Sequence, residues 1–277
     1  MRKLFFIIAI CMGAITVQGK DRFEKTVPVT QFDKVSLTAG FIVNYTQGVN
    51  HECTIFASPK DMEHVKAEVK NNQLYISVII DKKKMKKMKY STSILSEDVI
   101  VNVTSPKLVK ASCVGSGEFI ATTDIKSEDI QFEISGTGKI KLKKVTADNM
   151  KLTIAGAGDI DLQKANVKDI DVSIAGAGDI NIDNVDSACQ KTVLSVAGAG
   201  EISASFTDCD ELKCSIAGAG EIELKGKAAN YSESIAGSGR IKKDKLLIIT
   251  RLCFALLLVW GRRCVSLLPN NYIFLKI

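Results

Sequence analysis

Acidic side chains recur at one fixed position in this sequence, three residues after the first glycine of a short repeated motif. Four residues form this carboxylate column: Asp159, Asp179, Glu201 and Glu221. Asp161 and Glu223 follow two residues after Asp159 and Glu221. Carboxylates one strand spacing apart repel one another unless a cation or solvent separates them. Because hard cations take several oxygen ligands, one interpretation is a Ca²⁺ ladder. Lys139 and Arg240 hold the same position at the two ends, so screening by basic neighbours is the simpler interpretation.

Two cysteines also occupy equivalent positions, because Cys189 and Cys209 each lie nine residues before the next motif glycine. If neighbouring repeats stack as strands do, about 4.8 Å apart, a disulfide can join these thiols. Disulfides persist in the oxidising compartments that exported proteins enter. Other repeats place Ala147, Val167 and Ala228 in this column, so a position that simply takes small residues is the alternative.

Residues for the common hydrolytic mechanisms are scarce. His51 and His64 are the only two histidines, which leaves little material for histidine metal sites or Ser-His-Asp triads. A polysaccharide-acting enzyme would need carboxylates and basic residues that converge in one groove, whereas here they are spread along a column. We therefore predict no catalytic residue and no cofactor, and the carboxylate column is the only candidate metal site.

The elements that must position these residues are internal repeats. A seven-residue GxG motif recurs seven times at intervals of 19 to 22 residues. Its first glycines are Gly115, Gly136, Gly156, Gly176, Gly198, Gly218 and Gly237. Apolar and polar residues alternate on both sides of each GxG, which is typical of half-buried strands and unlike the spacing of a helix.

Two short strands joined by a glycine corner cannot bury a core alone, but stacked copies can. The sequence therefore predicts an all-β solenoid with one coil of about 20 residues per repeat and a GxG corner in each coil. A meander or sandwich is the alternative, and it is less consistent with one corner motif recurring in all seven units. We expect residues 109–241 to hold the GxG repeats.

Residues 20–108 show the same alternation with weaker repetition, so we assign 20–241 to a single domain. Within this part, Met62, Val65 and Val69 follow Ser58 and Asp61 at helical spacing, which predicts one short decorating helix capped by Ser58 or Asp61. The lysine-rich segment 82–89 is most simply a solvated loop, with contact to an anionic surface as the alternative.

The two ends of the chain differ from this domain. Residues 1–19 combine Arg2 and Lys3 with an apolar run and small residues, which indicates a signal peptide for export. Residues 242–277 form an atypical hydrophobic and basic tail with three interpretations: a membrane anchor at 246–260, a cap on the last coil, or a segment translated out of frame. Residues 1–19 carry a charge of +2 and residues 242–277 a charge of +6, whereas residues 20–241 sum to −2, so the overall +6 predicts no nucleic-acid partner.

Several segments together resemble a known family. Phe32–Val35, Gly40–Val43, Asn72–Ile76 and Val101–Pro106, leading into Gly-Ser-Gly repeats, are similar to the "putative auto-transporter adhesin head GIN domain" family of exported Bacteroidetes-type proteins. The resemblance covers about residues 28–241. It implies a right-handed parallel β-helix-like fold and a role in the cell envelope or at the cell surface. It brings no catalytic residue that could be carried over to this sequence.

We therefore expect a non-catalytic exported β-solenoid that acts as an adhesive or structural binding module. The expected compartment is the periplasm, the outer membrane or the cell surface. A partner is not named by the sequence, and a surface glycan or an envelope or host protein fits the class. Membrane contact is expected only through the signal peptide or the 246–260 segment. The alternatives are a polysaccharide-acting β-helix enzyme and a cation-binding stabilising or sensor module.

Overall fold

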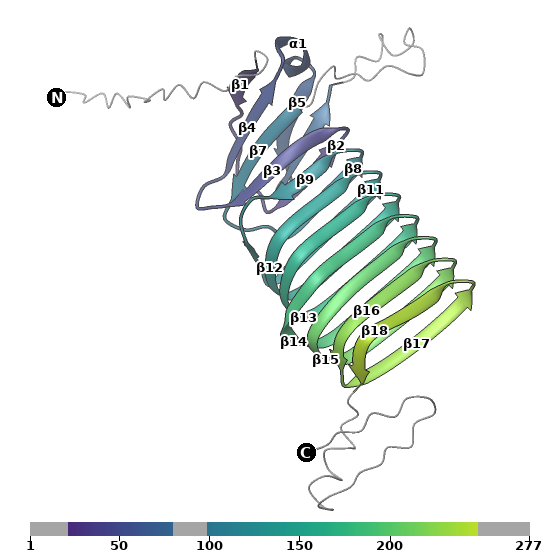
Figure 1. The fold of residues 1–277 in the computed structure, drawn as a ribbon. Helices are drawn as coiled ribbons and strands as arrows, with labels where there is room; N and C mark the ends of the chain where they lie inside the picture. The colour runs from purple at the N-terminus through teal and green to yellow at the C-terminus, as the bar shows by residue number, and fades with distance from the viewer. Residues whose placement is uncertain (1–21, 80–98, 249–277) are drawn as a thin grey trace, which may run out of the picture.

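The computed structural model describes residues 22–79 and 99–248 of the chain (Figure 1). Most of these residues belong to strands, and the described ranges contain one helix of four residues. The all-β class and the stacked β-solenoid are confirmed. The predicted signal peptide, the 82–89 segment and the tail beyond Ile248 lie outside the described residues. No helix within the described ranges is long and apolar enough to cross a membrane.

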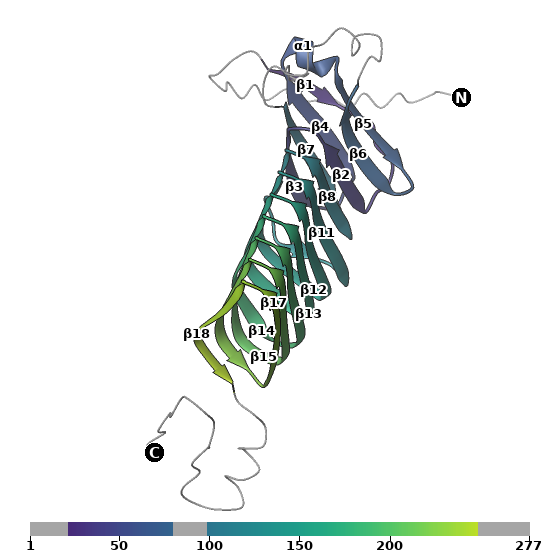
Figure 2. The same cartoon turned by 90° about the vertical axis from the view of Figure 1, so that its right-hand side faces the viewer.

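The repeat region consists of strands that run from one GxG corner to the next. Its strands are β11 (Asp129–Gly136), β12 (Lys139–Gly156), β13 (Asp159–Gly176), β14 (Asp179–Gly198), β15 (Glu201–Gly218), β16 (Glu221–Ala228), β17 (Asn230–Gly237) and β18 (Arg240–Ile248). Successive coils pair in parallel, and equivalent residues of the repeats face one another across the strands. Figures 1 and 2 show the coils stacked along one axis, with β17 and β18 at one end. The stacking predicted from the motif spacing is therefore present.

The two glycines of each corner have different roles. Gly156 and Gly176 have φ values of 139° and 138°, a conformation that side chains other than glycine rarely adopt. A Cβ atom on Gly176 would also overlap the carbonyl oxygen of Gly156 in the preceding coil. The second glycine, such as Gly178, lacks the positive φ, but a Cβ atom there would overlap the carbonyl oxygen of Gly158. Between successive GxG coils, stacking at backbone contact distance thus requires glycine at both positions.

The core lies between the two faces of each coil and is filled by the alternating apolar columns. Ile154, Ile174 and Ile216 are almost completely buried, as the strand pattern predicts. Towards the N-terminal end, aromatic side chains fill part of the interior, and the ring of Phe119 stacks on Tyr45 with centroids 5.7 Å apart. Small repeats thus share one continuous hydrophobic interior.

The N-terminal part is less regular than the repeats. Its elements are β1 (Phe23–Thr26), β2 (Lys34–Thr38), β3 (Phe41–Gln47), β4 (Glu52–Ala57), α1 (Pro59–Met62), β5 (Val65–Lys70), β6 (Gln73–Val78), β7 (Val99–Ser105), β8 (Lys110–Gly115), β9 (Glu118–Ala121) and β10 (Ile125–Lys126). β2 pairs in parallel with both β6 and β8, and β3 pairs with both β7 and β9. The coil formed by β2 and β3 comes first in the sequence, but it therefore lies between the β6–β7 and β8–β9 coils. Antiparallel pairing of β5 with β6, and of β1 and β7 with β4, borders this end.

The predicted helix is present but shorter than its apolar spacing indicates. The side chain of Ser58 caps it by accepting a hydrogen bond of 3.1 Å from the backbone N–H of Asp61. Val65 and Val69 belong instead to β5, so their assignment to the helix is wrong. Asn71 and Asn72 have φ values of 52° and 58° and form the tight turn that pairs β5 with β6. This hairpin overrides the local helical spacing.

Candidate functional site

The carboxylate column forms a continuous row across the solenoid. Asp159 pairs with Asp179, Asp179 with Glu201 and Glu201 with Glu221 in the parallel registers of β13 to β16. Each residue begins its strand directly after the GxG corner, so the corner glycines fix its position. The sequence therefore predicted correctly that these four residues lie next to one another. The carboxylates are spread over four coils and do not meet at a single point.

Basic residues close both ends of this row. Lys139 Nζ lies 2.8 Å from Asp159 Oδ2, and the Asp159 carboxylate raises the pKa of Lys139. At the other end Arg240 Nε lies 2.6 Å from Glu221 Oε2, and Lys242 also forms an ion pair with Glu221. Lys242 and Arg240 together hold the pKa of the Glu221 carboxyl below its ordinary value. This geometry is the one expected from charge screening.

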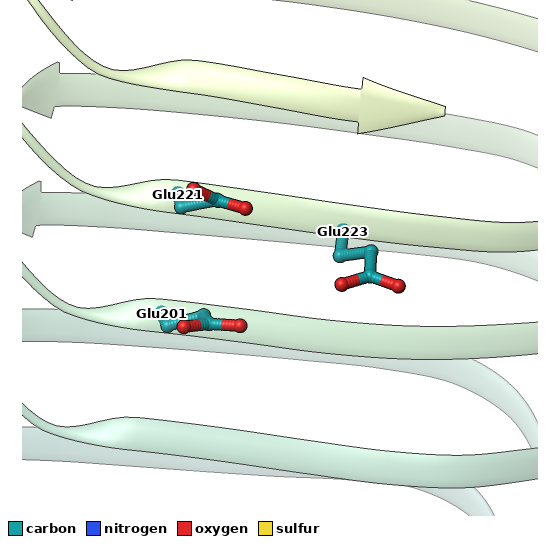
Figure 3. Close-up of side chains that lie close together, drawn as sticks. All are labelled: Glu201, Glu221 and Glu223. Carbon is teal, nitrogen blue, oxygen red and sulfur yellow. The ribbon is translucent and has the colours of Figure 1, made fainter. Parts of the chain in front are cut away.

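Among the described residues, one group of three acids is close enough to share a cation. Glu201, Glu221 and Glu223 each offer a carboxylate oxygen, and these oxygens lie within 4.8 Å of one another (Figure 3). Asp159 and Asp179 are not in this group, whereas Glu223, which lies outside the carboxylate column, is. Lys225 Nζ lies 2.6 Å from Glu223, so two of the three carboxylates already have basic partners. The group is therefore a network of ion pairs at the surface. Its carboxylate oxygens are the kind of ligand that calcium binds in proteins.

The opposite face of the coils carries small side chains and a shallow groove of about 410 Å³. Two columns line it, one of hydroxyl residues (Thr153, Ser173, Ser195, Ser215 and Ser234) and one of alanines (Ala155, Ala175, Ala197, Ala217 and Ala236). Neighbouring hydroxyls contact one another, and Ser215 Oγ lies 3.0 Å from Ser195 Oγ. We name this surface the Ser/Ala groove. This groove was not predicted from the sequence, although small residues at one and three positions before each of these motif glycines were a visible signal.

A second hollow of about 480 Å³ lies on this same face and is lined mainly by residues of β11 to β14. It brings together acids and lysines, including Asp129, Asp169, Asp171 and Lys151. Lys151 Nζ lies 3.3 Å from Asp171 Oδ2, and both side chains are about half exposed. A glycosidase acid needs a shielded carboxyl whose pKa is raised. The half-exposed ion pair of Lys151 and Asp171 does not provide that environment.

Cys189 and Cys209 face each other directly in the register of β14 and β15. Both are completely buried, and both stand as thiols. The adjacency expected from their sequence positions is therefore present, while a bond between them remains a prediction. Cys113 and Cys214 lie buried in apolar columns, and burial raises the pKa of the Cys113 thiol to about 11.

The comparisons with known proteins match this architecture. A family model described as "Putative auto-transporter adhesin, head GIN domain" matches residues 31–190 and 184–250. The chain belongs to this family. The head GIN resemblance noted in the sequence is therefore confirmed, over nearly the same range. No functionally curated protein matches the chain.

Solved structures share the fold of this head GIN protein at low sequence identity. A putative adhesin from Bacteroides fragilis is 22% identical with a TM-score of 0.69, covering 81% of this chain and 97% of its own. A putative lipid binding protein from Parabacteroides distasonis gives the same TM-score and coverage at 23% identity. A putative adhesin from Parabacteroides merdae is 17% identical with a TM-score of 0.61, covering 82% and 98%. At these identities the likeness establishes the fold.

The last coil of this head GIN domain ends in polar residues. Glu233 occupies a column that is apolar in the preceding repeats, and Lys243 Nζ lies 2.8 Å from its carboxylate. Tyr231 also hydrogen-bonds to Glu233, and Lys243 Nζ lies 4.5 Å from the centre of the Tyr231 ring. We name these three residues the polar end cluster. They give the terminal repeat the polar character that solenoid ends need for solubility.

Proposed function

We propose that this protein is an exported, non-catalytic adhesive module of the cell surface, and that it binds its partner along the face of the solenoid. The observation that carries this proposal is the even distribution of its polar groups. Carboxylates and hydroxyls recur once per coil in straight columns, and ion pairs close the ends of the carboxylate column. Such columns suit an extended partner that is contacted at many equivalent points.

The Ser/Ala groove is the surface that fits this role best. It crosses five coils without a charged side chain in its lining, so a polymer chain can approach the backbone closely. Its serine and threonine hydroxyls both donate and accept hydrogen bonds, as the hydroxyls of a glycan do. A surface glycan is therefore the proposed partner, and an envelope or host protein is the alternative. The names of the solved relatives as putative adhesins support an adhesive role.

Export is part of this proposal and depends on residues 1–19, whose sequence has the features of a signal peptide. A chain that has been exported from the cytoplasm can reside in the periplasm, in the outer membrane or at the outer cell surface. An adhesin must reach the outer surface to meet a glycan or a host protein. We therefore assign the solenoid to the outer face of the cell.

The proposal is tested by binding of the purified chain to arrays of glycans and matrix proteins. Ala197→Glu places a charge in the middle of the Ser/Ala groove, and Ala197 is exposed, so the core is not disturbed. Gln163→Glu adds the same charge on the opposite face and serves as the matched control. We expect Ala197→Glu to reduce binding at least tenfold and the control to retain it. Equal binding by both variants would rule out the groove as the contact surface.

A further inference from the structure

We propose that Cys189 and Cys209 form a disulfide that links β14 to β15, and that this bond forms while the chain folds. The proposal depends on the export step of the proposed function, because disulfides persist in oxidising compartments. The geometry itself does not depend on export. The experiment below therefore tests the two separately.

The first support is the register. Cys189 lies directly opposite Cys209 on the neighbouring parallel strand. Neighbouring strands lie about 4.8 Å apart, and this spacing falls within the Cα separation that disulfides span. Both side chains are completely buried. The two side chains are therefore neighbours in register and are shielded from solvent.

The second support is the position of the pair in the solenoid. β14 has 20 residues, whereas β13 and β15 have 18 each. The register between β14 and β15 shifts between Ile182 and Val185 and again between Val185 and Ala188. Cys189 follows directly after the second shift. A covalent link at this point fixes the register where the longer coil would otherwise slip.

The third support is Thr192, a buried polar residue beside both sulfurs. Its Oγ1 lies 3.3 Å from Cys189 Sγ and 3.6 Å from Cys209 Sγ. The equivalent position in other repeats holds Met150, Ile170 or Leu212. The smaller threonine leaves room for the pair, and its hydroxyl can donate a hydrogen bond to a disulfide sulfur as well as to a thiol.

The other cysteines of the described residues have no cysteine opposite them. Cys113 faces Leu37 and Ile134, and Cys214 faces Leu194 and Glu233. Cys53 faces Val103. The same column as the pair holds Ala147 opposite Val167, where the coils are regular in length. A cysteine pair in register thus coincides with the one long coil of β12 to β15.

The chemistry requires an oxidant, and a thiol–disulfide oxidoreductase of the export compartment is the class that supplies it. One cysteine thiolate attacks the disulfide of the oxidant and releases one thiolate of that protein. The second cysteine thiolate then attacks the mixed disulfide and releases the reduced oxidant. Two electrons pass to the oxidant, two protons leave the thiols, and one S–S bond forms. Because both sulfurs are buried after folding, exchange takes place before β15 closes on β14.

The test is peptide mapping of the full chain after refolding with oxidised and reduced glutathione. Free thiols are alkylated in denaturant before trypsin digestion. Cleavage after Lys168, Lys191 and Lys213 places Cys189 in peptide 169–191 and Cys209 in peptide 192–213. Cys214 falls in a separate peptide, 214–225, which reports on non-specific oxidation. We expect the first two peptides to be linked and Cys214 to be alkylated. Alkylation of both Cys189 and Cys209 would overturn the proposal.

Two further measurements test the folding step and the export step. Chain that is folded with its thiols reduced and then exposed to oxidised glutathione should stay reduced at 189 and 209 over hours, and rapid oxidation would overturn the claim that the bond forms during folding. Thiol trapping in the native host should show the linked peptides. A bond that forms on refolding but is missing in cells would support the disulfide geometry and contradict export.

Stability provides an independent readout. The oxidised chain should melt roughly 5 to 10 °C above the same chain after reduction in denaturant and refolding with reductant. Cys189→Ala with Cys209→Ala should melt near the reduced form and lose its response to reductant, since alanine occupies this column at Ala147 and Ala228. Cys53→Ala is the matched control and should keep the response. An equal melting temperature for the oxidised and reduced chains would contradict a role in stabilising the coils.

Discussion

Ala39 occupies the corner position in the β2–β3 coil that Gly115 holds in the neighbouring β8–β9 coil. The backbone N–H of Ala39 donates a hydrogen bond of 3.1 Å to the carbonyl oxygen of Val114. The φ of Ala39 is 86°, and that of Gly115 is 110°. One coil therefore makes the same corner with Ala-Gly-Phe that the repeats make with GxG. Its alanine adopts a backbone conformation that favours glycine.

Ala39→Gly should stabilise the protein by about 0.5 to 1 kcal/mol, because it relieves this conformation at a small cost in unfolded-state entropy. Chemical denaturation at fixed pH measures the change. Ala155→Gly is the control, since Ala155 lies in a regular strand with ordinary φ, and it should destabilise the protein by about 0.5 to 1 kcal/mol. Destabilisation by Ala39→Gly would show that the corner is not strained.

Gly176→Ala should destabilise the solenoid by about 3 kcal/mol or more, because it combines a positive φ with overlap of the Gly156 carbonyl oxygen. Thermal melting monitored by circular dichroism is the measurement. Ala177→Ser alters the exposed middle residue of the same corner and should leave the melting temperature within about 1 °C. Similar losses in the two variants would contradict the backbone contact between coils.

The ion pairs of Glu221 should make stability depend on acid pH. Lys242 and Arg240 lower the pKa of this carboxyl in the folded state, so the contribution is present above the unfolded pKa and is lost as the pH falls through the lower, folded-state pKa. The melting temperature of the wild type should therefore fall more between pH 5 and 3 than that of Glu221→Gln. Asp183→Asn is an exposed control that should follow the wild type. Parallel curves for all three chains would contradict this role.

Calcium should have little effect, because Arg240, Lys242 and Lys225 already balance the charge of the Glu201, Glu221 and Glu223 group. Millimolar Ca²⁺ should shift the melting temperature by less than about 1 °C. Arg240→Ala with Lys242→Ala removes the basic partners of Glu221. Ca²⁺ should then raise the melting temperature of this double variant, and the further change Glu201→Gln should abolish that rise. A large shift in the wild type would favour the cation-binding alternative.

Glu233→Leu should promote self-association, because it removes the centre of the polar end cluster from a coil whose strand β17 is exposed at every position except Tyr231. Ile235 beside it is already 43% exposed. Light scattering after size exclusion measures the mass. Lys164→Leu adds the same side chain to the middle of the solenoid and should remain monomeric. A monomeric Glu233→Leu chain would show that the cluster is not needed to protect this end.

Most of the repeat architecture could be predicted from the sequence, and the reason is physical. A GxG corner every 19 to 22 residues leaves one stacking arrangement, in which Ile154, Ile174 and their equivalents are buried in all but the last repeat. The same alignment placed the carboxylate column and the pair Cys189 and Cys209 on neighbouring strands. These features depend on the repeat register alone.

The remaining features depend on contacts between distant segments. The placement of β2 between β6 and β8 was not predictable, because alternation within a strand does not specify its parallel neighbours. The β2–β3 corner could not be recognised in the sequence, since Ala39 occupies the position where a glycine is expected. Val65 and Val69 were assigned to the helix from their helical spacing after Met62, although the Asn71-Asn72 pair is typical of a hairpin turn. The Ser/Ala groove arises only when small side chains of five coils align on one face.

The most direct test of an adhesive role is protease shaving of intact cells. An epitope tag in the 82–89 segment reports cleavage, and a periplasmic protein in the same cells reports leakage. We predict that added protease removes the tag from intact cells while the periplasmic reporter survives. Protection of the tag until the outer membrane is opened would place the solenoid inside that membrane and would contradict a surface adhesin.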